Sequence, residues 1–294
     1  MAFNLQTFKT RALTAVIFVV IMLAGLLWNH WSFFVLFSII HFGCWLEYQN
    51  LIGLLYPDYR EITGVHKYGV MIAGWAFMLF MTGEAFNINN IPLHKIGRML
   101  LLVSGVVLPL FLVFLKKKIS VKSLLYSLLG LLYISVSWGL MMNTRSIGMT
   151  SNNGYNFADK GWIIPVILIA SIWINDTMAY IVGSFIGKTP FSKISPKKTW
   201  EGTGGGAVLC VAAVTLAGYY LFHFKNISLL IAISSIAAVV GTSGDLLESK
   251  LKRMAGVKDS GHILPGHGGF LDRFDSLILA TPFVWLYLFL LNLL

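Results

Sequence analysis

The segment Leu264–Ser276, LPGHGGFLDRFDS, places two aspartates, an arginine, a histidine and three glycines between two strongly apolar stretches. Asp272 and Asp275 are three residues apart, as are Asp245 and Glu248 upstream, so each pair can share one helix face. Carboxylates that lie close together repel unless a cation lies between them. Mg²⁺ is held by one or two carboxylates together with substrate phosphates. The spacing therefore indicates a site for a divalent metal and phosphate.

The same segment has the means to bind the phosphates themselves. Gly266, Gly268 and Gly269 allow positive φ and close backbone approach, so a run of amides could face an anion. His267 lies among these glycines. Positive charge comes from four residues nearby in the sequence: Lys252, Arg253, Lys258 and Arg273.

A second polar segment, 188–202, reads KTPFSKISPKKTWEG and carries four lysines. It is either a basic patch on the membrane surface, where each lysine adds about 1 kcal/mol, or a phosphate-binding loop, since lysine suits a polyphosphate. Ser195 and Pro196 predict a turn within it. The following GTGGG, residues 202–206, favours close packing between helices over a phosphate cradle, because the Lys-Ser/Thr of a P-loop is absent.

Asp176 lies within an apolar run, ILIASIWINDTMAYIVGSFIG. A carboxylate at mid-bilayer costs about 2.5–3.5 kcal/mol on an insertion scale, so its presence needs a reason. One interpretation is a hydrogen-bonded contact between helices, assisted by Asn175 and Thr177. The other, which we favour, is a metal or ligand partner that lines a polar cavity.

The composition predicts that these residues sit in a polytopic membrane protein. Of 294 residues, 57% are hydrophobic and 12% charged, against about 25% charged in soluble domains, and the mean hydropathy is +0.76. The two cysteines, Cys44 and Cys210, fall inside apolar runs, which excludes a disulfide framework and a CxxC metal site. The net charge of +10 could suggest nucleic acid, but its distribution points to the membrane.

Nine segments are long and apolar enough to predict spanning helices. They are 12–28, 31–47, 68–86, 99–115, 121–142, 162–186, 203–222, 227–244 and 277–294. The short connection at Asn29 and His30 predicts a tight helical hairpin. No cleavage site follows the first run, so we interpret it as a retained membrane helix and not a signal peptide. The polar stretch 143–161 is typical of an ordinary surface loop.

The basic residues orient this all-α fold. With the N-terminus in the cytoplasm, inner segments hold 17 of the 22 lysines and arginines and outer segments 5, as the positive-inside rule requires. The C-terminus then lies outside. We predict an N-terminal membrane region of about five spans, 1–160, and a catalytic membrane region, 161–294, with cytoplasmic loops at 188–202 and 247–276.

The stretch Ser249–Asp275, SKLKRMAGVKDSGHILPGHGGFLDRFD, resembles the signature of the phosphatidate cytidylyltransferases, or CDP-diacylglycerol synthases. That signature runs S-x-L-K-R, four residues, K-D-x-G, two residues, then L-P-x-H-G-G-x-x-D-R-x-D, and every specified position is present. SPKKTWEG and NDTMAY also resemble family segments. The resemblance implies a membrane nucleotidyltransferase of phospholipid biosynthesis, which joins CTP and phosphatidic acid into CDP-diacylglycerol and pyrophosphate. It also implies Mg²⁺, a second cation such as K⁺, and a homodimer among membrane lipids. The distribution of charge predicts no nucleic acid partner.

From this chemistry and the residue types, we assign roles to the polar residues as hypotheses. Metal is expected at Asp245, Asp272, Asp275 and Asp176. The expected catalytic residues are Asp245, Asp272, Asp275, His267, Lys252 and Arg253. Substrate binding is expected at Lys197, Lys198, Lys258, Arg273, Gly268, Gly269 and Ser195. His267 as a packing residue is the alternative to its role in the nucleotide pocket. A bacterial inner membrane, with the site facing the cytoplasm, is the expected location.

Three rival functions are open to a chain of this kind. An ion-coupled or lipid transporter would centre on Asp176, with dispensable inner loops. A CTP-using lipid kinase would transfer the γ-phosphoryl group and release CDP. A structural membrane protein leaves the segment 249–275 unexplained. The D-G-x-x-A-R…G-x-x-x-D-x-x-x-D pattern of the CDP-alcohol phosphotransferases is absent.

Overall fold

The computed structural model describes residues 5–114, 120–152, 156–192, 194–261 and 268–291. Long helices dominate, as predicted, and the strands form two short antiparallel hairpins. The chain divides into two compact units. The first comprises Met1–Trp162 and Met254–Arg273, and the second Ile163–Arg253 and Phe274–Leu294. The segment that follows α10 in the chain thus groups with the N-terminal helices.

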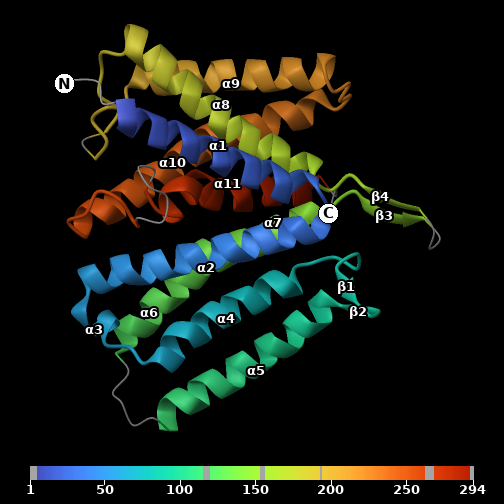
Figure 1. Cartoon of the computed structure of the whole chain (residues 1–294), viewed down its shortest axis with the longest axis vertical. Helices are drawn as coiled ribbons and strands as arrows, with labels where there is room; N and C mark the ends of the chain where they lie inside the picture. Colours follow the sequence, from blue (N-terminus) through green and yellow to red (C-terminus); the bar gives the residue numbers. More distant parts are fainter. Residues whose placement is uncertain (1–4, 115–119, 153–155, 193, 262–267, 292–294) are drawn as a thin grey trace. The chain divides into compact units, whose positions relative to one another are not determined.

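The first unit is a helical bundle in which α2, α4 and α5 lie side by side (Figure 1). A buried apolar cluster of Leu79, Phe86 and Leu93 packs where α4, α5 and the β1–β2 hairpin meet. The helices of the first unit are α1 (Leu5–Leu27), α2 (His30–Leu55), α3 (Pro57–Arg60), α4 (Gly64–Phe80), α5 (Leu93–Phe114), α6 (Val121–Gly130) and α7 (Val136–Ser146). Its strands are β1 (Asn87–Ile88), β2 (Ile91–Pro92), β3 (Met149–Asn152) and β4 (Asn156–Asp159).

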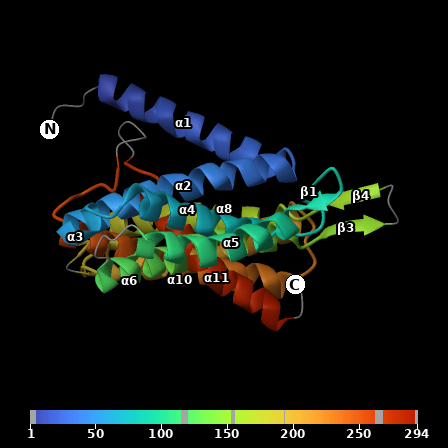
Figure 2. The ribbon, with the colours of Figure 1, turned by 90° about the horizontal axis from the view of Figure 1, so that it is seen from below.

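The predicted tight turn between the first two helices is confirmed. Asn29 caps α2: its side chain accepts from the Ser32 N–H at 2.8 Å, and the Ser32 hydroxyl accepts from the Asn29 N–H at 3.1 Å. This reciprocal arrangement satisfies two of the unpaired donors at the helix start. The helices separate from this turn (Figure 2), and near it Gly25 lies so close to Leu36 that a Cβ would be 2.5 Å from the leucine Cδ2.

A π-helical turn, η1 (Leu131–Ser135), joins α6 to α7. It places the Ser135 hydroxyl among buried side chains of α2. Trp45 donates to that hydroxyl at 2.9 Å, and His41 Nε2 lies 3.0 Å from it. Polar groups inside an apolar bundle are costly without partners, so the turn supplies α2 with an interhelical polar contact.

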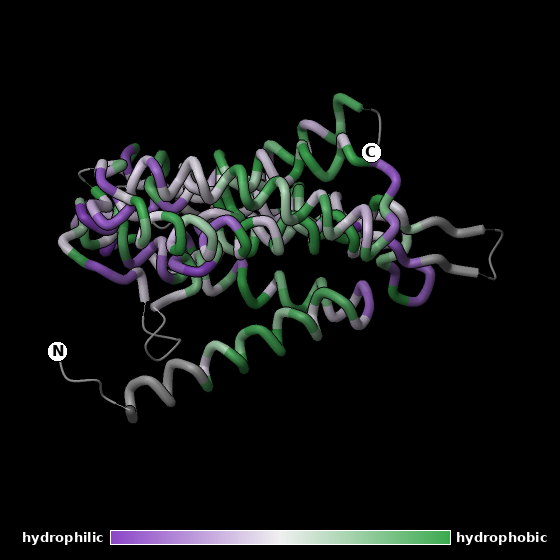
Figure 3. The backbone as a smooth tube through the Cα atoms, turned by 90° about the horizontal axis from the view of Figure 1, so that it is seen from above, coloured by the Kyte–Doolittle hydropathy of each residue, from purple (hydrophilic) through white to green (hydrophobic). Residues whose placement is uncertain are grey.

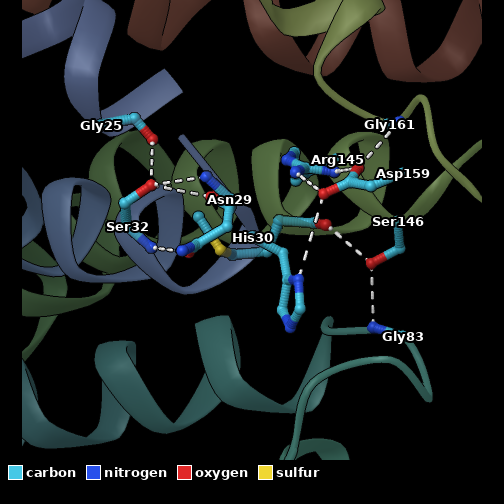
Figure 4. A network of polar contacts seen from close by, with 10 residues as sticks. Gly25, Asn29, His30, Ser32, Gly83, Arg145, Ser146, Asp159 and Gly161 are labelled. Carbon is cyan, nitrogen blue, oxygen red and sulfur yellow. Dashed lines mark hydrogen bonds and ion pairs between the residues drawn. The ribbon is translucent and has the colours of Figure 1, made fainter. Parts of the chain in front are cut away.

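The polar stretch 143–161 is more regular than the ordinary surface loop that we expected. Its backbone forms the β3–β4 hairpin, with Met149 paired to Asp159. Asp159 is bidentate with Arg145 at 2.5 Å for both bonds, and the Arg145 guanidinium lies 5.5 Å from the Phe33 ring centre. Figure 4 shows this contact beside the Asn29–Ser32 cap and the bond from the Gly83 N–H to Ser146. Arg145 is only 1% exposed, so the ion pair anchors the hairpin.

We expect the Asp159 carboxylate to make part of the stability of the first unit depend on pH. Burial opposes its ionisation, but the hydrogen bonds and charge of Arg145 outweigh burial and hold the Asp159 pKa below its usual value. The stabilisation is therefore present above the unfolded pKa, about 4, and is lost as the pH falls through the folded value. Asp159→Asn should lower the free energy of unfolding at pH 7 by about 2 kcal/mol and remove this acid dependence. Thermal unfolding in detergent between pH 7 and pH 3 measures both.

Glu84→Gln is the matched control for this variant. Glu84 belongs to the same unit, has an 80% exposed side chain and lies 3.6 Å from His94. An exposed ion pair contributes little, so its unfolding temperature should match the wild type. Equal unfolding profiles for Asp159→Asn and Glu84→Gln would contradict the anchoring role of Asp159.

The second unit is built from α8 (Ile163–Ile186), α9 (Trp200–Tyr220), α10 (Ile227–Met254) and α11 (Leu271–Leu290). Gly206 brings α8 and α9 into backbone contact: a Cβ there would lie 2.6–2.7 Å from Ala179 atoms. Gly202, one turn earlier, is also tightly packed: a Cβ there would lie 2.8 Å from the Ala179 carbonyl oxygen and 2.9 Å from the Gly183 Cα. The interpretation of residues 202–206 as a packing motif is confirmed.

A helix lies at each of the nine predicted spans. In the part of the chain that the structure describes, six helical segments are long and apolar enough to cross a membrane. They are His30–Leu55, Val121–Ser146, Ile163–Ile186, Trp200–Tyr220, Ile227–Met254 and Leu271–Leu290. Figure 3 shows α1 as hydrophobic over most of its described length. The chain is an integral membrane protein; the count of nine and the N-in, C-out orientation stay predictions.

Candidate active site

A cavity of about 390 Å³ in the second unit holds several of the polar residues singled out from the sequence. This volume lies in the range of small-molecule sites. Polar and charged side chains from α8, α10 and the loop between α8 and α9 line it. Those that bear on chemistry are Asp176, Ser195, Lys197, Lys198, Thr242 and Asp245.

The loop between α8 and α9 is held in shape by its own backbone and by Glu201. Pro190 and Thr199 form an antiparallel bridge, and the Lys198 N–H donates to the Ser195 carbonyl at 3.1 Å, which confirms the predicted turn. The Glu201 carboxylate accepts from the N–H groups of Lys188 and Thr189, both at 3.1 Å. The two ends of the loop are thus tied together.

Asp245 is the carboxylate that Lys198 of the loop reaches. Its Oδ2 forms an ion pair with Lys198 Nζ, and its Oδ1 accepts from the Ser249 hydroxyl at 3.2 Å. Asp245 and Lys198 side chains are 30% and 28% exposed, so the pair is open to a ligand. Lys198 of the loop and Asp245 of α10 therefore bring opposite charges together in the lining of the cavity.

Asp176 enters the same cavity from α8. Its neighbour Asn175 is buried and donates to the Thr242 hydroxyl of α10 at 3.4 Å, and the Thr177 hydroxyl bonds the carbonyl of Trp173 in its own helix. Asn175 therefore supplies a contact between α8 and α10, and Asp176 lines the cavity.

Asp275 lies on α11 near this cavity. It is 8% exposed and lies within electrostatic range of Asp245, Lys252 and Asp176. Close packing explains the approach, because a Cβ at Gly244 would lie 2.6 Å from the Asp275 carbonyl oxygen. Lys252 forms an ion pair with the fully buried Glu248 side chain one turn away on α10.

The described part of the loop 258–272, which we call the signature loop, belongs to the first unit. Its Asp272 Oδ2 accepts from the N–H of Ser260 at 2.9 Å and the N–H of Gly269 at 2.8 Å. Gly268 has φ +81°, the region in which glycine is strongly favoured. The Gly269 amide thus donates within the protein, and its predicted contact with a substrate phosphate stays a prediction.

The structure therefore places some of the predicted site residues in the second unit and others in the first. Asp176, Ser195, Lys197, Lys198 and Asp245 line one cavity, with Asp275 and Lys252 nearby in the same unit. Gly268, Gly269, Asp272, Lys258 and Arg273 belong to the first unit. Arg253 is an exposed residue of α10, and His267 lies outside the described residues. Their catalytic, substrate and metal roles stay predictions.

Sequence reasoning gave no role to Glu47 of α2. Its carboxylate accepts from the N–H groups of Phe270 and Leu271, both at 2.8 Å, at the start of α11. A signal for it exists in the sequence, because Glu47 is the sole Asp, Glu, Lys or Arg between positions 30 and 55. An ionisable residue in such a run is expected to have a partner.

Across the described residues, no cluster of three or more His, Cys, Asp or Glu side chains has an arrangement that could hold a metal ion. Two carboxylates nevertheless line the cavity beside two lysines. This donor set fits Mg²⁺, which commonly takes one or two carboxylates and completes its coordination with water and substrate phosphates.

A comparison with known protein families decides the class of this chain. The model of the cytidylyltransferase family matches residues 9–291. The chain belongs to this family. The family prediction made from residues 249–275 is therefore confirmed, and with it the prediction of a transferase.

Relatives of this cytidylyltransferase include bacterial and plant proteins. A Staphylococcus saprophyticus phosphatidate cytidylyltransferase is 32% identical over 277 residues, which cover 93% of this chain and 96% of the relative. One from Staphylococcus aureus (strain COL) is 38% identical over 169 residues, 57% of this chain and 60% of the relative. The Arabidopsis thaliana phosphatidate cytidylyltransferase 4, chloroplastic, is 41% identical over 128 residues, 44% of this chain and 33% of the relative. The S. aureus match thus spans under two thirds of that protein.

Proposed function

We propose that this chain transfers the cytidylyl group of CTP to phosphatidic acid, with CDP-diacylglycerol and pyrophosphate as products. The observation that carries the proposal is the cavity in which Lys197 and Lys198 face Asp176 and Asp245. Family membership and the names of the relatives support the same reaction. We further propose that the site faces the cytoplasm of a bacterial inner membrane and that the enzyme is a homodimer.

The reaction brings together two polyanions, so the site has to neutralise charge. A phosphate monoester has a second pKa of about 6, so the lipid phosphate is largely ionised at neutral pH and needs no strong base. Its oxygen attacks the α-phosphorus of CTP, the bond from that phosphorus to the bridging oxygen breaks, and pyrophosphate leaves with the electron pair. Positioning and electrostatic stabilisation supply most of the catalysis in such transfers.

The residues of the cavity have different roles in this reaction. Lys197 and Lys198 bind phosphate oxygens as compact point charges with three donors each. Asp245 and Asp176 would hold Mg²⁺, with Asp275 beside them, and a second cation such as K⁺ would sit near the same carboxylates. When bound, the divalent ion would neutralise phosphate charge. A phosphate that binds Lys198 would compete with Asp245 for it, which would free the carboxylate for metal.

We expect activity to require both substrates and a divalent cation. The purified enzyme with CTP, phosphatidic acid and Mg²⁺ should release pyrophosphate. Omission of either substrate should abolish the release, as should EDTA, and added Mg²⁺ should restore it. Diacylglycerol in place of phosphatidic acid is the matched control, because it lacks the attacking phosphate. Pyrophosphate release that is unaffected by EDTA would contradict the metal proposal while leaving the transfer reaction in place.

A further inference from the structure

Glu47 lies in an unusual setting for a carboxylate. It sits in α2, a helix with membrane-spanning length and hydropathy, and is 4% exposed. Within the described residues, no lysine, arginine or histidine forms an ion pair with it. A buried charge without a counter-ion is expensive unless several hydrogen bonds satisfy it. The groups that donate hydrogen bonds to Glu47 therefore indicate which part of the protein this carboxylate positions.

Among the described residues, its donors come from the signature loop and the start of α11. Glu47 Oε1 accepts from the Phe270 N–H at 2.8 Å, and Oε2 accepts from the Leu271 N–H at 2.8 Å. Oε2 also lies 2.7 Å from the Ser260 hydroxyl. The first N–H groups of a helix lack partners within the helix, and its dipole favours a negative charge there. Glu47 thus caps α11 from a helix more than 200 residues away in the sequence.

Two glycines of the signature loop make room for this contact. A Cβ at Gly261 or at Gly269 would overlap the Glu47 carboxylate. Both glycines belong to the signature, in K-D-x-G and in H-G-G. Their lack of a side chain therefore has a structural reason in Glu47, in addition to any contact with substrate.

Glu47 is also linked to Asp272, a predicted metal ligand. The Ser260 hydroxyl lies 3.0 Å from Asp272 Oδ2 and 2.7 Å from Glu47 Oε2, so one hydroxyl joins the two carboxylates. The N–H groups that Glu47 holds belong to the two residues directly before Asp272. A change at Glu47 would therefore move the start of α11 and the Asp272 and Arg273 side chains with it.

We propose that Glu47 is a positioning residue of the enzyme, which holds the signature loop and the start of α11 in the geometry that turnover requires. This inference rests on the proposed cytidylyl transfer. Functional groups need placement within about 0.5 Å, which is supplied by the residues that surround them. Loss of such support lowers kcat more than it raises KM, because the interactions lost are those made in the transition state.

The test is Glu47→Gln with Glu47→Asp beside it. The glutamine keeps the size but has one acceptor oxygen, so either the Phe270 or the Leu271 amide loses its partner. We expect Glu47→Gln to lower kcat at least about tenfold, with the KM for CTP within about threefold of wild type. Glu47→Asp keeps both oxygens on a shorter side chain and should recover part of the loss. Hydrogen exchange of the Phe270 and Leu271 amides should be at least about tenfold faster in Glu47→Gln.

Asp159→Asn is the matched control, because it removes a partly buried carboxylate contact of the same unit that does not touch the signature loop. It should lower the unfolding temperature and leave kcat of the folded protein unchanged. Wild-type kcat in folded Glu47→Gln, or unchanged exchange of the two amides, would overturn the proposal. If Glu47→Gln does not fold, Ser260→Ala takes its place, with an expected loss of kcat of about threefold. Wild-type kcat together with wild-type amide exchange in Ser260→Ala would also overturn the proposal. A wild-type enzyme without lipid product would count against the proposed function, and amide exchange would then decide the role of Glu47.

Discussion

An Asp245→Asn enzyme is expected to lose cytidylyl transfer by at least about 100-fold, equivalent to about 2.7 kcal/mol of barrier. Asp245 lines the cavity and pairs with Lys198. Asparagine keeps the shape but removes the charge that a divalent cation requires. The initial rate at saturating CTP, phosphatidic acid and Mg²⁺ is the measurement. Asp58→Asn, at an exposed carboxylate of the short helix α3, is the matched control and should keep the wild-type rate.

A second variant separates the two roles that Asp245 could have. If Asp245 serves only to hold Lys198, then Lys198→Met and Asp245→Asn should cost the same, and the double variant should cost no more than either. If it also binds metal, Asp245→Asn should lower the rate further in the Lys198→Met background. This double-mutant comparison isolates the pairwise contribution. A fully active Asp245→Asn enzyme would remove Asp245 from the mechanism.

The largest effect on stability is expected from Gly206→Val. A Cβ at Gly206 would lie within 2.7 Å of the Ala179 backbone, so the valine side chain has to force α8 and α9 apart. Overpacking of this kind costs about 3 kcal/mol. Because Ala179 and Thr203 line the cavity, activity should fall as well. The thermal unfolding midpoint of the detergent-solubilised protein measures the first effect, and the initial rate measures the second.

Gly204→Val in the same helix is the control for Gly206→Val. Nothing lies within 4 Å of a Cβ at Gly204, so its unfolding midpoint and rate should stay near wild type. Both variants add the same side chain to one helix and differ only in the surface that receives it. Equal stability of the two variants would contradict the close α8–α9 packing.

The helices could be predicted because the signals for them are local. Apolar runs of spanning length and the caps and turns between them can be read along the chain, and helices form at each predicted position. The β3–β4 hairpin was missed because its sequence is rich in Asn and Gly and lacks the alternation of a half-buried strand. The π-helical turn at Leu131–Ser135 has no recognised local signal in this sequence.

The residue types of the site could be predicted from the sequence, but the contacts between these residues could not. Lysines and aspartates at suitable spacing predicted a phosphate and metal site, and several of these residues line one cavity. Glu47 was missed because its contacts are with the signature loop more than 200 residues away. Hydrophobic periodicity does not indicate which residues far apart in the sequence make such a contact. The same limit applies to Gly269, whose position indicated phosphate binding although it also packs against a carboxylate.

The most direct test of the proposed function is the fate of labelled phosphate. Purified enzyme is incubated with phosphatidic acid, Mg²⁺ and CTP that carries the label on either the α- or the γ-phosphate. The account predicts that label from the α-position enters the lipid, that γ-label appears in pyrophosphate in equal amount, and that EDTA stops both. Lipid labelled only from the γ-position would contradict it and indicate a kinase. A complete absence of labelled lipid would contradict it as well and favour a transporter centred on Asp176.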